Sequence, residues 1–239
     1  MDNNQEFLRN YKRLEGLLEE KYNLDSGSNN SSSIIRYYHE LRKSYSVRDK
    51  QRAVKLDSCR TIRNMLSHED VLDAITVSDE YIMFLSDEIK RIVNPITALQ
   101  VAVKIDKAFT CSLDDEVRKV MEVMVKRGFS HVPVIDEQGY LIGVFSQKIV
   151  FHRLYAEGDI GSDEKAIIKT FEKYLPISAH ISENYVFVSA NETIDKITRV
   201  FEESRGQKNK IGLIFVTKEG KPAEKILGFI TPYDLIYYH

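Results

Sequence analysis

The chain has 239 residues, of which 43% are hydrophobic and 29% charged, the balance of a globular protein and not of a disordered one. Lys and Arg total 34 against 36 Asp and Glu, a net charge of −2, so no overall positive field exists to hold DNA, and we expect no specific DNA binding. The two cysteines lack the paired spacing of a zinc site and are too few for a disulfide scaffold. Because no apolar run approaches the ~18 residues of a membrane helix and no signal-peptide pattern opens the chain, we expect a cytoplasmic protein without a membrane segment.

The first 93 residues have helical periodicity. Apolar residues recur three and four positions apart, the pattern of a helix with one buried face. Ser33, at the end of a polar loop over 25–33, is the expected cap of the second helix, and Asn94-Pro95 ends the last one. The predicted helices cover residues 7–18, 34–41, 47–66 and 78–93. They predict a small all-α bundle in residues 1–93.

After Pro95 the pattern becomes strand, helix, strand and strand, and this order then repeats. The first set is a strand over 109–112, a helix over 113–127, and strands over 132–135 and 140–145. The second set is a strand over 186–189, a helix from 194, and strands over 213–216 and 227–231. An internal duplication decides an architecture better than a single motif does. The sequence therefore predicts an α+β fold, in which a helical bundle precedes two β-α-β-β-α repeats.

Two strings in the repeats resemble one known family. The first runs from Ser130-His-Val-Pro-Val to Gly143-Val-Phe-Ser146, and the second is Gly228-Phe-Ile-Thr231-Pro-Tyr-Asp234. Each repeat resembles a CBS domain, and the two together resemble a Bateman module, with the first repeat at 96–156 and the second at 157–239. The resemblance implies an adenine nucleotide, such as AMP, ADP or ATP, as a regulatory ligand.

The second repeat carries the more complete ligand signature. A strand ends at Thr231, where backbone N–H groups and the hydroxyl are suited to hold a phosphate, and Asp234 is placed to accept hydrogen bonds from ribose hydroxyls. The first repeat has Ile149 at the position of this aspartate. The alternative from the residues alone is that Thr231 caps a helix and Asp234 favours its dipole.

The resemblance also implies where adenine would bind in the second repeat. These residues are Ser182 and the backbone around Lys210, Ile211 and Gly212. The family also contains pairs that bind no ligand and serve only as dimerisation platforms, so an empty structural dimer is a further alternative.

The third predicted helix carries a second group of polar residues. Arg60, Asn64 and His68 are each four positions apart, so a helix extending to His68 would align them on one stripe with Arg63 beside it. Cys59, Ile62 and Leu66 would form the stripe that faces the core. Residues 36–63 hold nine Lys or Arg against three Asp or Glu, a local charge of +6, and interleaved tyrosines suited to stacking on bases. The alternative is a solvated basic helix face.

Arg63-Asn64-Met-Leu-Ser-His68 resembles the Arg-Asn-x-x-x-His motif of HEPN domains. These are small all-helical domains, many of which are metal-independent ribonucleases that act as dimers. The resemblance covers residues 1–93 and implies that His68 is the general acid/base, that Arg63 stabilises the phosphate and that Asn64 orients the pair. The RNA's own 2′-hydroxyl would attack, giving a 2′,3′-cyclic phosphate without any metal.

These patterns together predict an adenine-nucleotide-sensing homodimer in which the CBS pair controls a HEPN-like endoribonuclease domain that binds RNA. The main alternative is a non-catalytic module in which the helical domain docks a partner protein and the CBS pair gates that docking.

Overall fold

The computed structural model describes residues 2–24, 32–44, 46–68, 74–158 and 165–238. The chain divides into two compact units, Met1–Pro95 and Ile96–His239, each with its own core. In the described part of the chain, no helix is long and apolar enough to cross a membrane.

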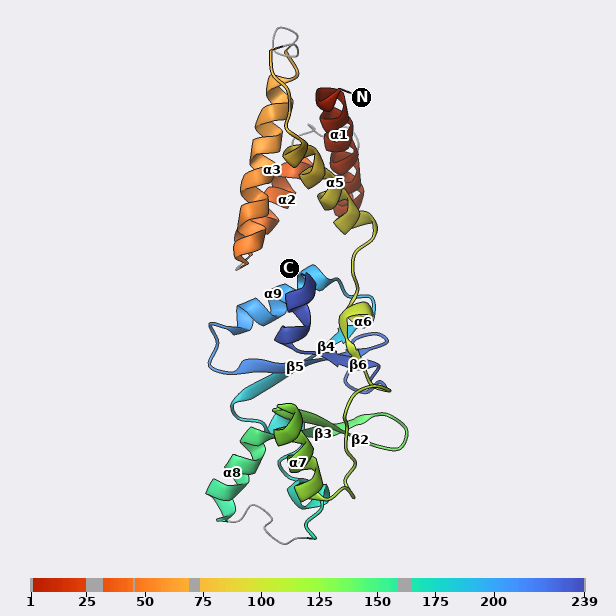
Figure 1. Cartoon of the computed structure of the whole chain (residues 1–239), viewed down its shortest axis with the longest axis vertical. Coiled ribbons are helices and arrows are strands. Elements are labelled where there is room, and N and C mark those ends of the chain that lie inside the picture. The colour runs from red at the N-terminus through yellow and green to blue at the C-terminus, as the bar shows by residue number, and fades with distance from the viewer. Residues whose placement is uncertain (1, 25–31, 45, 69–73, 159–164, 239) are drawn as a thin grey trace. The chain divides into compact units, whose positions relative to one another are not determined.

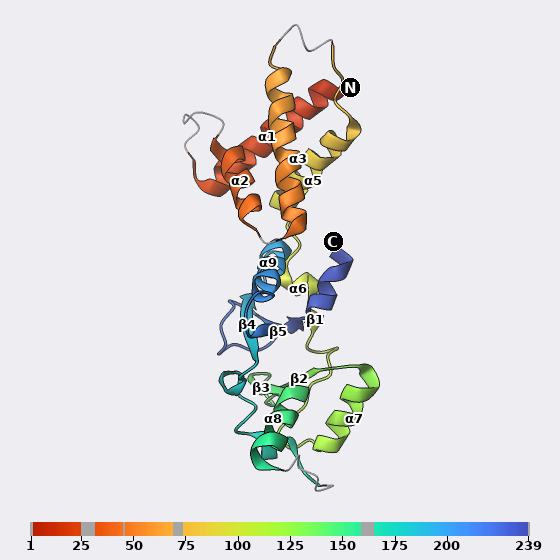
Figure 2. The ribbon, with the colours of Figure 1, turned by 90° about the vertical axis from the view of Figure 1, so that its left-hand side faces the viewer.

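The first unit is a bundle of helices, and the four predicted helices are all present in its described residues. α1 packs along α5 and α2 packs along α3 (Figures 1 and 2). Their bounds are α1 Asn3–Tyr22, α2 Ser32–Lys43, α3 Val47–Met65 and α5 Asp79–Val93. As predicted, Cys59 and Leu66 are buried in the core, and Ile62 packs against it. The predicted polar loop lies outside the described residues over 25–31.

The predicted cap of the second helix is wrong. α2 begins at Ser32, one residue before the expected cap. Ser33 is already helical and buried, and its hydroxyl donates to the backbone oxygen of Glu15 on α1 at 3.4 Å. The hydroxyl thus bonds a neighbouring helix and does not cap its own, and a local capping pattern cannot reveal such a contact.

A charged cluster lies inside the helical core. Nε and Nη2 of Arg52 donate to the two carboxylate oxygens of Glu88 at 2.8 and 2.7 Å, and Nη1 donates to Asp49 at 2.7 Å. The Tyr37 hydroxyl accepts from Arg52 and donates to Glu88, both at 2.6 Å. All four residues are buried. Since buried charges are tolerated only when paired and hydrogen-bonded, this cluster fixes how α2, α3 and α5 pack.

The second unit contains two sheets. The four-stranded sheet has the order β1-β6-β5-β4, with β4 and β5 parallel and the other neighbours antiparallel. The second sheet is an antiparallel pair of β2 and β3. The strands are β1 Val103–Lys104, β2 His131–Ile135, β3 Leu141–Ser146, β4 Glu183–Ser189, β5 Lys210–Thr217 and β6 Gly228–Ile230.

Helices cover both sheets. α7 and α8 pack with the β2–β3 pair in one core, and α9 packs with β5 and β6 in another (Figure 1). The helices are α6 Ala98–Val101, α7 Val117–Arg127, α8 Gln147–Glu157 and α9 Ile194–Ser204, with short 3₁₀ helices η1 Ile168–Phe171, η2 Ile177–Ala179 and η3 Pro232–Tyr238.

The start of the first repeat differs from the prediction. The strand expected over 109–112 is a single bridge between Cys111 and Val134, and the helix expected from 113 begins at Val117. The carboxylate of Asp115 accepts the backbone N–H and the hydroxyl of Ser112 at 2.6 and 3.1 Å. Such local side-chain bonds offer the backbone an alternative to helix and strand.

Each repeat is completed by a segment that lies outside its own sequence range. β1, which precedes the first repeat's helix, pairs with β6 of the second repeat. In turn, the segment between α8 and β4, whose described residues are 165–182, is the connecting segment. Its residues Ile168, Phe171 and Leu175 are buried in the core of the first repeat. Gly143 permits this contact, because a Cβ there would lie 2.1 Å from the backbone oxygen of Leu175. The two repeats are therefore interlocked by their flanking segments.

Candidate functional site

The predicted ligand residues of the second repeat lie at one end of its sheet. The parallel pairing of Glu183 with Lys210 sets the starts of β4 and β5 side by side, and Ser182 immediately precedes β4. The antiparallel pairing of Ile214 with Ile230 brings the end of β6, and so Thr231, beside the start of β5. The fold thus gathers residues from three strand ends that are far apart in the sequence.

Asp234 binds Thr231 directly. Its Oδ2 atom accepts the backbone N–H and the hydroxyl of Thr231, each at 2.7 Å, and the N–H of Asp234 donates to the Thr231 backbone oxygen at 3.2 Å. The carboxylate bond to the Thr231 N–H is one half of a capping box, here at the start of the short η3, but the Thr231 hydroxyl donates to Asp234 and accepts nothing from the backbone in the described residues. Oδ1 of Asp234 has no hydrogen-bond donor among the described residues. That oxygen is available to a ribose hydroxyl, whereas the two Thr231 donors expected for a phosphate are already engaged.

At the equivalent position of the first repeat, both signature side chains are buried. Ser146 is fully buried, and its hydroxyl accepts the N–H of Ile149 at 3.3 Å as the cap of α8. Ile149, which replaces the signature aspartate, is buried in the core of the first repeat. The side chains of this position therefore serve packing and offer no ribose acceptor.

A buried carboxylate, Glu183, joins the two repeats. Oε1 accepts from Nε2 of His131 and from Nζ of Lys148, both at 2.9 Å, and Oε2 accepts from the hydroxyl of Tyr185 at 3.0 Å. Nδ1 of His180 lies 3.9 Å from Oε2. His131 and Lys148 belong to the first repeat, at the starts of β2 and α8. Glu183, Tyr185 and His180 belong to the second.

In this Glu183 cluster, hydrogen bonds compensate for the burial of the carboxylate charge. Burial by itself would raise the pKa of Glu183, but the hydrogen bonds from His131 and Lys148, together with the nearby His180, outweigh it and hold the pKa well below its usual range. Burial, followed by the nearby Glu183 charge, raises the pKa of Tyr185. Glu183 is therefore a carboxylate and Tyr185 a neutral donor at neutral pH.

Sequence reasoning missed this cluster, although it lies next to predicted ligand residues. Gly212 packs against it, since a Cβ there would lie 3.0 Å from Nε2 of His131 and 3.3 Å from Cε1 of Tyr185. His131 and Glu183 are 52 positions apart, so no short spacing joins them. The available signal was an acidic residue shortly before the predicted strand over 186–189.

A hollow of about 360 Å³ lies between α8 and the segment before β4. Among the predicted ligand residues, only Ser182 lines it. Its other lining residues are Gln147, Lys148, Ile149, Phe151, His152, Tyr155, His180 and Ile181. Lys148 and His180 thus connect the hollow to the Glu183 cluster.

The predicted stripe of Arg60, Asn64 and His68 on one helix is wrong for its last member. α3 ends at Met65 with Leu66 as its C-cap, and the N–H of His68 donates to the Met65 backbone oxygen, three residues back, at 3.1 Å. His68 therefore lies in the turn after the helix, where it is exposed. The physical reason is local: the Ser67 hydroxyl donates to the backbone oxygen of Arg63 at 2.9 Å. The Ser67 N–H instead donates to Asn64, three residues back, at 3.2 Å, so the chain leaves the regular helix there.

The other residues of the predicted cleavage site remain on α3. Nη1 of Arg63 donates to Oδ1 of Asn64 at 3.3 Å. Arg63 also lies close enough to Tyr11 and Glu15 on α1 to lower their pKa values, although burial raises both overall. No group of three or more metal-ligating side chains is found in the described ranges.

Comparison with known proteins identifies the second unit. Residues 101–156 and 177–239 each match the CBS domain family. This chain therefore carries a tandem pair of CBS domains, as the sequence predicted. No curated protein matched the chain.

Solved structures of CBS proteins resemble about 60% of the chain. The CBS domain pair of protein MJ0100, in complex with 5′-methylthioadenosine and S-adenosyl-L-methionine, is 14% identical, with a TM-score of 0.40, and covers 60% of this chain and 95% of its own. CBSX2 in complex with AMP is 14% identical, with a TM-score of 0.42 and coverages of 59% and 94%. A hemolysin-like protein containing a CBS domain, from Oenococcus oeni, is 18% identical, with a TM-score of 0.40 and coverages of 60% and 90%.

Proposed function

We propose that this protein is an adenine-nucleotide-sensing regulator, in which the CBS pair controls the helical unit. CBS pairs are known as adenine-nucleotide-binding regulatory modules, and both repeats here match that family. The observation that carries the proposal is the junction of β6 and η3, where Asp234 is held by Thr231 and keeps Oδ1 available. Ribose would bind Oδ1, and adenine would bind beside Ser182 and the start of β5.

Transmission requires that the nucleotide bind two arrangements of the protein with different affinity. The Glu183 cluster is suited to such a role, because Lys148 is held by a carboxylate of the other repeat and also lines the hollow beside Ser182. A ligand that drew Lys148 away from Glu183 would weaken the link between the repeats. We propose a homodimer as the assembly in which this change acts.

For the helical unit we propose metal-independent RNA cleavage of the HEPN type. The contact between Arg63 and Asn64 supports this assignment. The 2′-oxygen of the RNA would attack the adjacent phosphorus and the bond to the 5′-oxygen would break. His68 would take the proton from the 2′-hydroxyl or give one to the leaving oxygen, and Arg63 would hold the charge on the phosphate. Because cleavage needs both proton transfers, each protomer of the dimer would supply one histidine.

A docking role without chemistry is the second candidate for the helical unit. One observation favours it: His68 lies beyond the end of α3, off the stripe of Arg60 and Asn64. In that case the CBS pair would gate the binding of a partner protein.

The test begins with thermal stability of the full chain against AMP, ADP, ATP and S-adenosylmethionine. A ligand at about 100 times its dissociation constant stabilises by about 2.7 kcal/mol. We expect a stabilising ligand whose effect is lost in Asp234→Asn. The matched control is Asp115→Asn, because Asp115 accepts the same two donors from Ser112 away from the site. No shift with any of the four, or an equal loss in both variants, contradicts nucleotide sensing.

RNA cleavage is then measured in EDTA, with and without the stabilising ligand. We expect a 2′,3′-cyclic phosphate product, abolished by His68→Ala, and a rate that changes when the ligand is added. Cleavage that persists in His68→Ala, or that needs a metal, refutes the ribonuclease assignment and leaves the docking role.

A further inference from the structure

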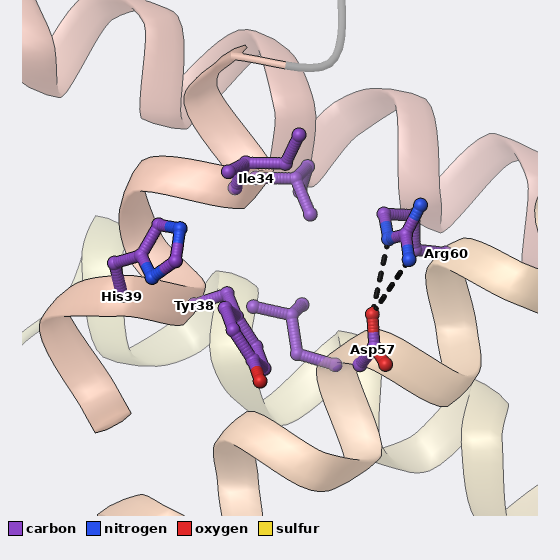
Figure 3. A pocket seen from close by; sticks show the side chains of 7 residues that line it. Ile34, Tyr38, His39, Asp57 and Arg60 are labelled. Carbon is purple, nitrogen blue, oxygen red and sulfur yellow. Dashed lines mark hydrogen bonds and ion pairs between the residues drawn. The ribbon is translucent and has the colours of Figure 1, made fainter.

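A second hollow lies in the helical unit, between α2 and α3 (Figure 3). Its volume is about 370 Å³, within the size range of small-ligand sites. The apolar part of its lining includes Ile34 and Leu56, which are buried. Figure 3 shows Tyr38 on the α2 side of the hollow and the pair of Arg60 and Asp57 on the α3 side. Two aromatic rings, those of Tyr38 and His39, an apolar lining and one charged pair thus converge on the same space.

The charged pair keeps one guanidinium nitrogen and one carboxylate oxygen for a ligand. Nε and Nη2 of Arg60 both donate to Oδ1 of Asp57, at 3.0 and 2.9 Å. Within the described residues, Nη1 of Arg60 and Oδ2 of Asp57 have no hydrogen-bond partner. A guanidinium only donates and a carboxylate only accepts. The edge of a nucleobase is the complementary group, since it carries an N–H donor next to a nitrogen or oxygen acceptor.

Tyr38 supplies a surface for the flat face of such a base. Its ring is partly buried and belongs to the packed edge of the helical core, so it is held in place before any ligand binds. Stacking on aromatic side chains is a common way in which proteins hold unpaired bases, and it works with every base because each has a π-face. An acidic peptide would satisfy Arg60 but would leave the ring and the apolar lining without a partner.

Cationic residues continue from the lining of the hollow along both helices. On α2, the exposed residues Arg42 and Lys43 follow the lining residues of that helix by one turn, and therefore share their face. Arg63 extends the charge along α3. Arg52 is not one of these cations because it is paired in the core. A row of cations beside a base-sized hollow favours a phosphate-bearing strand as the ligand.

We propose that this hollow holds one unpaired base of a single-stranded RNA, stacked on Tyr38 with its edge bound to Asp57 and Arg60. The phosphates of the strand lie along these cationic residues. Because Asn64 follows Arg60 by one helical turn, the strand runs on from the hollow towards the residues proposed for cleavage. Only this last point rests on the proposed function, since binding of the strand does not require that it be cleaved.

The test is RNA binding by the full chain, measured by fluorescence anisotropy with a labelled single-stranded oligonucleotide. All proteins carry His68→Ala, so that the RNA stays intact. We expect Tyr38→Ala to weaken binding about tenfold, whereas Tyr38→Phe keeps the ring and binds as the parent does. Asp57→Asn also weakens binding about tenfold. Its control is Asp87→Asn, because Asp87 makes a similar exposed pair with Lys90, three residues on, at 3.2 Å.

Undiminished binding in Asp57→Asn and in folded Tyr38→Ala overturns the proposal, since charge alone would then hold the strand. Asp57 is about half exposed, so its variant folds even if Tyr38→Ala does not. Free AMP, GMP, CMP or UMP binding as tightly as the oligonucleotide also overturns it, by showing a mononucleotide site. RNA that binds as expected but is never cleaved by the parent chain refutes only the ribonuclease assignment.

Discussion

Replacing Glu183 by glutamine tests whether charge holds the two CBS repeats together. Glutamine keeps the shape of the side chain but removes the charge that receives hydrogen bonds from His131, Lys148 and Tyr185 at 2.9, 2.9 and 3.0 Å. A hydrogen bond to a charged group is worth about 1 kcal/mol more than a neutral one. Lys148 is 54% exposed and regains water, which reduces its share. We therefore expect a cost of about 2 kcal/mol, or a fall in Tm of about 4–8 °C.

The same substitution should change how stability depends on pH. The pKa of Glu183 is lowered in the folded chain, so its contribution is fully present above the usual glutamate pKa of about 4.3 and is lost as pH falls below that value. Glutamine does not titrate. The difference between the parent and Glu183→Gln should therefore shrink when the pH is lowered from 7 to below about 4.3.

Urea unfolding followed by circular dichroism measures both effects, since the chain has no tryptophan for fluorescence. The control is Glu116→Gln, because the carboxylate of Glu116 pairs with Lys119 at 2.6 Å on the exposed surface of the same unit. Such a surface pair contributes less than about 1 kcal/mol. The reasoning is refuted if Glu183→Gln costs no more than the control, or if its cost is the same at acid pH.

Three further predictions concern buried residues of the helical unit and of the CBS unit. Arg52→Met leaves Glu88 buried without its bidentate partner and should destabilise the helical unit by about 3–5 kcal/mol; urea unfolding checks this, and a loss below about 1 kcal/mol would contradict it. Gly143→Ala places a Cβ 2.1 Å from the Leu175 backbone oxygen and should lower the unfolding midpoint of the CBS unit alone. An unchanged midpoint would contradict this by showing that the connecting segment moves away at no cost. Burial raises the pKa of both cysteine thiols to about 12, so iodoacetamide at pH 8 should label them only after denaturation, as mass spectrometry can show.

The sequence alone was sufficient for features that depend on local periodicity. The stripe containing Cys59 and Leu66 faces the core of the helical unit as predicted, because apolar residues at helical spacing can be buried on one face only. Likewise, the two repeats were found by comparing the chain with itself, and the signature around Thr231 and Asp234 is a short string on consecutive elements. The residues of the stripe and of the signature lie within one or two helical turns of each other, and the duplication shows in the order of the elements along the chain.

Other features required the tertiary structure, because they join residues that are distant in the chain. β1 pairs with a strand of the second repeat, and the connecting segment packs in the core of the first. Both contacts depend on the tertiary arrangement of the repeats, and no residue spacing in the sequence predicts them. The Glu183 cluster brings together side chains 52 and 35 positions apart, and burying the carboxylate is tolerable only once His131 and Lys148 have arrived beside it.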